Sequence, residues 1–159
     1  MYLICSFVLM TKRFRMSDTK LPTVLVVEDS PDDLLFIQRA AVRTNLQMSL
    51  KSVTSGDEAI SYLLGEGSYG DRNIYPLPSV VLTDTRMPRI SGLELVTWIR
   101  QQDDFKDLPI VVMSSSTDTD NAKRFAAFGI SLYFVKPMSI RGFEEILREV
   151  MLLIPQNQE

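Results

Sequence analysis

Four apolar segments of this chain end in residues that could together bind a phosphoryl group. The segments end in Glu28-Asp29, Asp84, Ser114 and Lys136. The carboxyl ends of parallel strands line one crevice of an open sheet, so these residues are expected to converge on a single site. Three carboxylates, a hydroxyl and an ammonium suit a divalent cation that holds a phosphoryl group on a carboxylate.

The residue types suggest separate roles. A carboxylate such as Asp84 can attack phosphorus and give an acyl phosphate, provided that alignment and a metal neutralise the charge. Lys136 offers a compact positive charge for a phosphoryl oxygen, and Ser114 offers a movable hydroxyl donor. Glu28 and Asp29 repel each other unless a cation lies beside them. Magnesium is favoured over calcium because few carboxylates leave room for waters and phosphate oxygens.

Each of these residues also has a purely structural interpretation. An Asp or a Ser at a strand end is a common turn residue, and Lys136 before Pro137 could be a solvated loop charge. The pair Glu28-Asp29 could complement the positive end of the helix that follows. The combination of all four strand ends is what favours the phosphoryl site.

The elements that must position these residues alternate between strand and helix from residue 23 onward. This pattern predicts an α/β domain with a mostly parallel sheet. Strands are expected at 23–28, 47–53, 79–84, 109–114 and 131–135, and helices at 31–44, 56–66, 92–102, 117–128 and 140–154. The second strand alternates polar and apolar residues and is expected at an edge. Pro31 suits the first turn of a helix capped by Ser30, with Asp32 and Asp33 near its positive end, and Gly129 is expected to cap the fourth helix.

Composition narrows the function. The chain has 159 residues, of which 45% are hydrophobic and 23% are charged, as expected for one folded domain. A net charge of -3 leaves no broad basic surface, so no nucleic-acid binding is expected. The chain has no histidine and one cysteine, Cys5, which excludes Ser-His and Cys-His catalysis, histidine metal ligands and an internal disulfide, and favours a cytoplasmic location.

Two segments fall outside the strand and helix pattern. Residues 2–10 are apolar and precede Lys12, Arg13 and Arg15; this stretch is too short to span a bilayer and lacks the order of a signal peptide. We interpret residues 1–20 as an extension outside the domain, or alternatively as an apolar arm that docks on the domain or on a second copy. Residues 67–78 form a long connection, interpreted as a flexible loop since its glycines follow a helix and do not form a phosphate-binding loop.

At this point the chain resembles the receiver domains of two-component response regulators. The resemblance rests on Glu28-Asp29 after Val-Val, on Asp84 with Met87-Pro88 and Gly92 behind it, on Ser114 after an apolar run, and on Lys136-Pro137. The spacings between Asp84, Ser114 and Lys136 also match. The resemblance covers about residues 21–154, leaving 155–159 as a short tail, and implies a doubly wound five-stranded parallel sheet of order 2-1-3-4-5, the flavodoxin-like fold.

The resemblance implies a role for each matching position. Glu28, Asp29 and Asp84 would bind Mg2+ together with the backbone carbonyl of Arg86. Asp84 would accept the phosphoryl group from the phosphohistidine of a sensor kinase, and Ser114 and Lys136 would hold the phosphoryl oxygens.

Further expectations concern the switch. On phosphorylation the hydroxyl of Ser114 would move inward and Tyr133 would turn in behind it, which changes the face formed by the fourth helix, the fifth strand and the fifth helix. The family often has a cis bond at the position of Pro137. Arg86 and Ser116 occupy positions that influence the lifetime of the acyl phosphate.

A narrower resemblance concerns partners. Glu28 to Asp33, the long loop and the Tyr75-Pro76-Leu77-Pro78 segment resemble the stand-alone response regulators of bacterial phytochromes. This implies a light-sensing histidine kinase as phosphodonor, an output through a protein contact, and a possible homodimer through the fourth helix, fifth strand and fifth helix. No membrane partner is expected.

Two other functions remain open on the sequence. The chain could be a phosphorylation-independent receiver that serves as a scaffold. It could also be a phosphohydrolase with Asp84 as nucleophile, similar to haloacid-dehalogenase-like enzymes, but those want a second acid where Arg86 stands.

Overall fold

The computed structural model describes residues 20–155. Almost all of the proposed N-terminal extension and most of the proposed C-terminal tail therefore lie outside the described residues. Strands and helices alternate as expected: β1 (Thr23–Val27), α1 (Pro31–Thr44), β2 (Ser49–Val53), α2 (Gly56–Leu64), the 3-10 turn η1 (Gly67–Tyr69), β3 (Val80–Asp84), α3 (Gly92–Gln101), β4 (Ile110–Ser114), α4 (Thr119–Ala126), β5 (Leu132–Val135) and α5 (Ile140–Leu152).

The strands form one parallel sheet of order β2-β1-β3-β4-β5, which confirms the predicted topology. All residues of β1, β3 and β4 are buried, as expected for strands covered on both faces. Most of β2 is only partly buried, which agrees with its predicted place at an edge. The carboxyl ends of the five parallel strands consequently face the same way.

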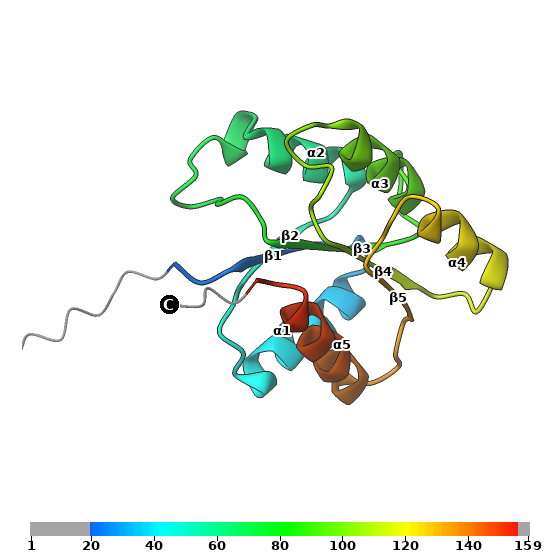
Figure 1. The fold of residues 1–159 in the computed structure, drawn as a ribbon. Helices are drawn as coiled ribbons and strands as arrows, with labels where there is room; N and C mark the ends of the chain where they lie inside the picture. The colour runs from blue at the N-terminus through cyan, green and yellow to red at the C-terminus, as the bar shows by residue number, and fades with distance from the viewer. Residues whose placement is uncertain (1–19, 156–159) are drawn as a thin grey trace, which may run out of the picture.

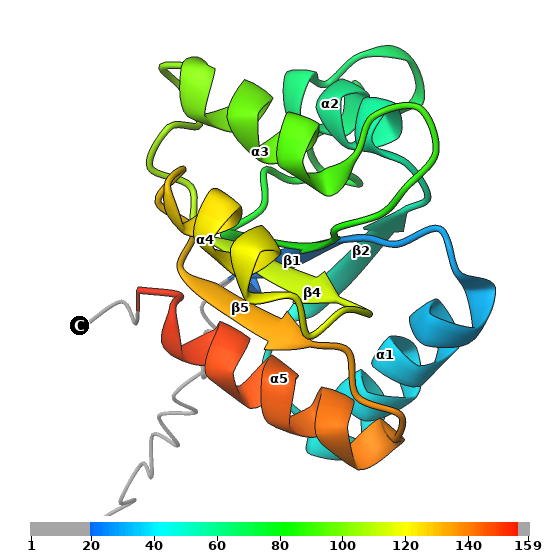
Figure 2. The same ribbon diagram turned by 90° about the vertical axis from the view of Figure 1, so that its right-hand side faces the viewer.

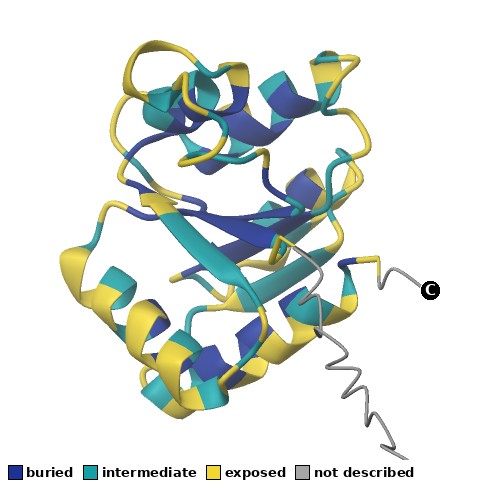
Figure 3. Ribbon diagram, turned by 90° about the vertical axis from the view of Figure 1, so that its left-hand side faces the viewer, coloured by how far each residue is buried: buried dark blue, intermediate teal, exposed yellow. Residues whose placement is uncertain are grey.

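Two helical layers enclose the sheet (Figures 1 and 2). Helices α1 and α5 pack on one face, where Ile37, Phe143 and Leu147 belong to one apolar cluster. Helices α2, α3 and α4 contribute to the other face, where Leu63, Ile99 and Phe125 belong to a second cluster. Buried residues gather along the strands and the inner sides of the helices (Figure 3). The sheet is thus fixed from both sides, which gives its carboxyl edge a rigid base.

Local signals set the helix starts. Ser30 caps α1 and accepts a hydrogen bond from the Asp33 amide, with Pro31 in the first turn. Helix α4 begins two residues later than predicted because Asp118, not an earlier residue, accepts from the Asp120 amide and caps it. The C-cap of α4 is Ala127 and not Gly129 as predicted, and Gly129 adopts a left-handed φ of 65° two residues further on. No helix in the range 20–155 is both long and apolar enough to cross a membrane.

The long connection between α2 and β3 is tied down by contacts, which the interpretation as a flexible loop did not anticipate. Arg72 donates hydrogen bonds of 2.7 to 3.2 Å to the carbonyls of Tyr62, Leu63 and Tyr75. The rings of Tyr62, Tyr69 and Tyr75 pack with centroids 5.0 to 5.9 Å apart. The Arg72 guanidinium therefore forms hydrogen bonds with backbone carbonyls at the end of α2. Gly65, in the left-handed conformation, is the C-cap of this helix.

Candidate functional site

The residues predicted to converge do lie at the carboxyl edge of the sheet. In the register of the sheet Ser114 lies beside Val135, and the Lys136 amide donates to the Ser114 carbonyl at 2.7 Å. The Glu28 amide donates to the Val53 carbonyl at 3.1 Å, which continues the sheet pairing by one residue. The backbone pairing of the sheet alone thus places these residues at its carboxyl edge.

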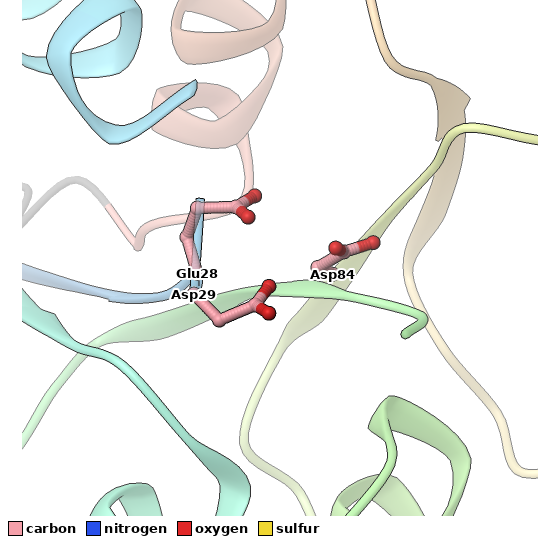
Figure 4. Close-up of side chains that lie close together, drawn as sticks. All are labelled: Glu28, Asp29 and Asp84. Atoms are coloured by element: carbon pink, nitrogen blue, oxygen red, sulfur yellow. The ribbon is translucent and has the colours of Figure 1, made fainter. Parts of the chain in front are cut away.

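An acidic group forms at the ends of β1 and β3. Glu28, Asp29 and Asp84 each have a carboxylate oxygen within 4.8 Å of those of the other two. Figure 4 shows the three side chains close together. Glu28 is fully buried, Asp84 is 4% exposed, and Asp29 is open to solvent. Like charges at this separation raise the energy of the site unless a cation offsets them.

Lys136 supplies part of that offset. Its Nζ lies 2.7 Å from Glu28 Oε2, 3.0 Å from Asp84 Oδ2 and 2.8 Å from Asp33 Oδ2. The side chain of Lys136 is only 9% exposed. A single ammonium is therefore shared among three carboxylates, while Asp29 contributes a further negative charge nearby.

Asp33 is the residue that the sequence interpretation missed. Its position in the first turn of α1 had suggested only complementation of the helix dipole. The structure brings its carboxylate into the site, where it pairs with Lys136. The available signal was that Asp33 follows Glu28 closely at the start of the helix that leaves β1.

The charges of the site perturb two pKa values. Burial raises the pKa of Glu28 above its ordinary value, and the contacts with Lys136 and the Ser30 amide offset this only in part. Burial alone would lower the pKa of Lys136, but its contacts with Asp33 and Glu28 and the charge of Asp84 outweigh burial and raise it. Lys136 is therefore charged throughout the physiological range.

Asp84 is held at both carboxylate oxygens. Oδ1 accepts from the Thr85 amide at 2.6 Å, and Oδ2 contacts Lys136. The adjacent helix approaches closely, because a Cβ on Gly92 would lie 2.2 Å from the Asp84 carbonyl oxygen. Gly92 is thus required by space: it lets the start of α3 pack against the end of β3, where the carboxylate is fixed.

Ser114 is linked to Asp84 through Thr85, a second residue that the sequence interpretation missed. The Thr85 hydroxyl donates to Ser114 Oγ at 3.3 Å, and the Ser116 amide donates to the same oxygen at 3.1 Å. Ser114 is 1% exposed. Its hydroxyl oxygen therefore accepts two hydrogen bonds in a polar network beside the carboxylate, and its own O–H can be donated to a phosphoryl oxygen.

Other predicted positions lie around this centre. Tyr133 is half-buried against Phe125, with ring centroids 5.9 Å apart, and its hydroxyl accepts from Asn121 at 3.1 Å. Arg86 is exposed in the loop after β3. Arg89 in the same loop pairs with Asp57 at 3.0 Å, which ties the loop to the start of α2.

The prediction of a cis bond before Pro137 is wrong for this structure, since the described residues contain no cis peptide bond. The trans form is the intrinsic preference of an X-Pro bond. Pro137 packs closely against Gly142 of α5: a Cβ at Gly142 would lie only 2.2 Å from the Pro137 Cβ.

The acidic group fits a divalent cation. Glu28 Oε2 is buried, and its close partner at 2.7 Å is the Lys136 ammonium, which also contacts two other carboxylates. Carboxylate oxygens from Glu28, Asp29 and Asp84 are hard ligands of the kind that Mg2+ prefers, and exposed Asp29 leaves one side open to water. One ammonium does not neutralise three clustered carboxylates, and a divalent cation would offset the remaining negative charge.

Comparison with known proteins agrees with this geometry. A model of the response regulator receiver domain matches residues 24–148. The probable methanogenesis regulatory protein FilR2 of Methanothrix harundinacea is 30% identical over 128 residues, which cover 80% of this chain and 79% of that protein. Response regulator Rcp1 of Synechocystis sp. is 26% identical over 137 residues, covering 85% and 91%.

Solved structures give the same result. The structure of response regulator RPA3017 in red light signaling of R. palustris superposes with a TM-score of 0.78 at 29% identity, covering 87% of this chain and 97% of that one. The Mn2+-bound form of Rcp1 gives a TM-score of 0.73 at 23% identity, covering 85% and 99%, and is a likeness of fold. Since the family model spans most of the described residues and the predicted strand-end residues meet at one site, the chain belongs to the response regulator receiver domain family.

Proposed function

We propose that this chain is a response regulator that accepts a phosphoryl group on Asp84 from the phosphohistidine of a sensor histidine kinase. The observation that supports this most directly is the Lys136 ammonium, 3.0 Å from the carboxylate of Asp84 and beside an acidic group able to hold a metal. A carboxylate nucleophile, a fixed cation and a metal position are the parts that phosphoryl transfer requires. The receiver unit would comprise residues 21–154.

Magnesium is the proposed cofactor. Glu28, Asp29 and Asp84 would hold it, together with the backbone carbonyl of Arg86. When bound, Mg2+ would neutralise charge on the phosphoryl oxygens and help to align the donor.

The chain's own groups account for the remaining steps. An Asp84 carboxylate oxygen attacks the phosphorus atom, the bond to the imidazole nitrogen of the donor breaks, and an acyl phosphate results. Lys136 stays close enough to transfer its contact from Asp84 Oδ2 to a phosphoryl oxygen. Ser114 can turn its hydroxyl from its present network to a second phosphoryl oxygen.

The proposed output is a change in the surface formed by α4, β5 and α5. Movement of Ser114 toward the phosphoryl group would open space next to β5, into which Tyr133 would turn. This movement would exchange the Asn121–Tyr133 hydrogen bond and the packing against Phe125 for an inward position. A local charge change would thereby bias a two-state surface.

We further propose that the phosphodonor is a bacterial phytochrome and that the protein acts in the cytoplasm through protein contacts, without binding nucleic acid or membrane. The similar protein RPA3017 is a response regulator in red light signalling of R. palustris, which supports a photoreceptor kinase here. The α4, β5 and α5 surface is the proposed homodimer contact. Phosphotransfer from a phytochrome kinase, compared with an unrelated histidine kinase, tests this choice.

The central experiment incubates the protein with magnesium and acetyl phosphate and measures intact mass beside the isosteric Asp84→Asn variant. One labile phosphate on the parent, absent from the variant, supports the proposal. Absence of the adduct with both acetyl phosphate and histidine kinases refutes it in favour of a phosphorylation-independent scaffold. Sustained release of phosphate over many turnovers favours a phosphohydrolase, which the presence of Arg86 at the position of a second acid argues against.

A further inference from the structure

Asp33 lies in the site without belonging to the acidic group that could hold a metal. It comes from the first turn of α1, whereas that group comprises Glu28, Asp29 and Asp84. Its carboxylate nevertheless lies 2.8 Å from the Lys136 ammonium, which makes this contact as short as those of the buried acids. Its side chain is 28% exposed, so it stands on the solvent side of Lys136.

Asp33 is one of three close counter-charges of Lys136. The ammonium is already held at 2.7 Å by Glu28 and at 3.0 Å by Asp84, and both of these carboxylates are almost fully buried. Removing Asp33 leaves Lys136 with two close counter-charges.

Phosphorylation changes the demand on Lys136. The ammonium has to bind a phosphoryl oxygen next to Asp84, and a lysine has three donors to share. At present the ammonium contacts three carboxylates, one of them Asp33. An incoming phosphoryl group, itself anionic, would meet the negative charge of Asp33 and compete with it for the ammonium.

We propose that Asp33 is a positioning residue that competes with the phosphoryl group for Lys136 and thereby slows phosphorylation of Asp84 by anionic donors. This inference rests on the proposed function, since it concerns the rate of the same transfer. Replacing the carboxylate by an amide of equal size removes the competing charge but not the buried pairs. We expect Asp33→Asn to raise the rate of phosphorylation by acetyl phosphate by about threefold to tenfold at low salt.

The experiment measures this rate for the parent and three variants at saturating magnesium. Asp32→Asn is the matched control, because Asp32 lies in the same helical turn, is exposed, and makes no ion pair within the described residues. Both substitutions remove the same favourable charge from the start of α1, so a helix-stability effect would appear in both. Asp33→Glu restores the charge and should return the rate to within about twofold of the parent. Each rate is measured at low and at high ionic strength, because screening should diminish a charge effect.

The outcomes are distinct. A faster Asp33→Asn, with a gain that shrinks in high salt and a parent-like Asp32→Asn, supports the inference. Equal rates for Asp33→Asn and Asp32→Asn overturn it, and so does a slower Asp33→Asn, which would mean that Asp33 assists Lys136. If the parent gains no phosphate, the proposed function has failed. The role of Asp33 is then tested by the affinity for beryllium trifluoride in the presence of magnesium, since that anion binds without phosphoryl transfer. An unchanged affinity in Asp33→Asn overturns the inference.

Discussion

Magnesium should stabilise the folded protein through the acidic group, and the structure allows the size of the effect to be worked out. Two unit charges 4.8 Å apart repel by about 1 kcal/mol at the dielectric constant of water and by about 3 kcal/mol at an effective value near 20. Lys136 offsets part of this repulsion among Glu28, Asp29 and Asp84. A divalent cation removes the rest and adds binding free energy to the folded state only.

At a magnesium concentration 100 times the dissociation constant, the gain is about 2.7 kcal/mol. For a domain of this size that corresponds to a rise in melting temperature of about 5–10 °C. Thermal unfolding followed by circular dichroism, with sodium chloride matched for ionic strength, measures the shift.

The decisive variant is Asp29→Asn. Asp29 is exposed and the described residues show no ion pair between it and Lys136, so its loss leaves the buried ammonium paired. If the lost ligand weakens binding about 100-fold, the same magnesium concentration stabilises by only about 0.4 kcal/mol, a shift of about 1 °C. Asp32→Asn, which changes an exposed acid outside the group, should keep the full shift. A full shift in Asp29→Asn, or none in the parent, would refute the assignment of the metal position.

Three further predictions concern stability. In metal-free buffer, the unfolding free energy of the parent should fall relative to that of Glu28→Gln as pH rises from 4.5 through the raised pKa of Glu28. The reason is that a buried acid with a raised pKa costs free energy only when it is charged. Urea titrations at several pH values test this, and parallel pH dependences of the two proteins would contradict it. Arg72→Ala should lower stability by about 2–3 kcal/mol in urea unfolding by leaving helix-end carbonyls unpaired, and Arg72→Lys should not restore it, since a lysine cannot reproduce the fork of contacts. Gly92→Ala should cost at least about 2 kcal/mol and slow phosphorylation of Asp84, because the added Cβ overlaps the carbonyl of that residue; parent-like stability and rate would exclude the close packing.

Much of the site follows from strand order alone. Glu28, Asp84, Ser114 and Lys136 each stand at the carboxyl end of an apolar run, and parallel strands bring such ends to one edge whatever the helices do. The bounds of β1, β3 and β4 were predictable to within one residue because buried parallel strands are continuous apolar runs.

The remaining features of the site depend on side-chain orientations, which tertiary packing sets and the local sequence does not show. Whether Asp33 points at solvent or at Lys136 depends on how α1 tilts against the sheet. Its contact with Lys136, the residue just beyond β5, could therefore not be predicted from its position in the helix alone. Thr85 looked like an ordinary loop residue. Its role arises because it directly follows β3, its amide donates to the Met113 carbonyl of β4, and its hydroxyl donates to Ser114. The loop after α2 looked polar and rich in glycine, whereas three tyrosine rings and Arg72 give it a packed interior.

The acidic side chains of the site outnumber its one lysine, and this excess of negative charge agrees with the switching function proposed for it. A carboxylate group fully neutralised by the protein would gain little from a metal, whereas here one ammonium is shared among three acids and Asp29 adds a further negative charge. Ligands can shift an equilibrium only by their differential affinity for its states, and the excess of negative charge is what a divalent cation would bind to. The Lys136 amide is hydrogen-bonded to the Ser114 carbonyl. If the Lys136 ammonium moves toward a phosphoryl group on Asp84, the ends of β4 and β5 should therefore shift together, next to the surface that includes α4.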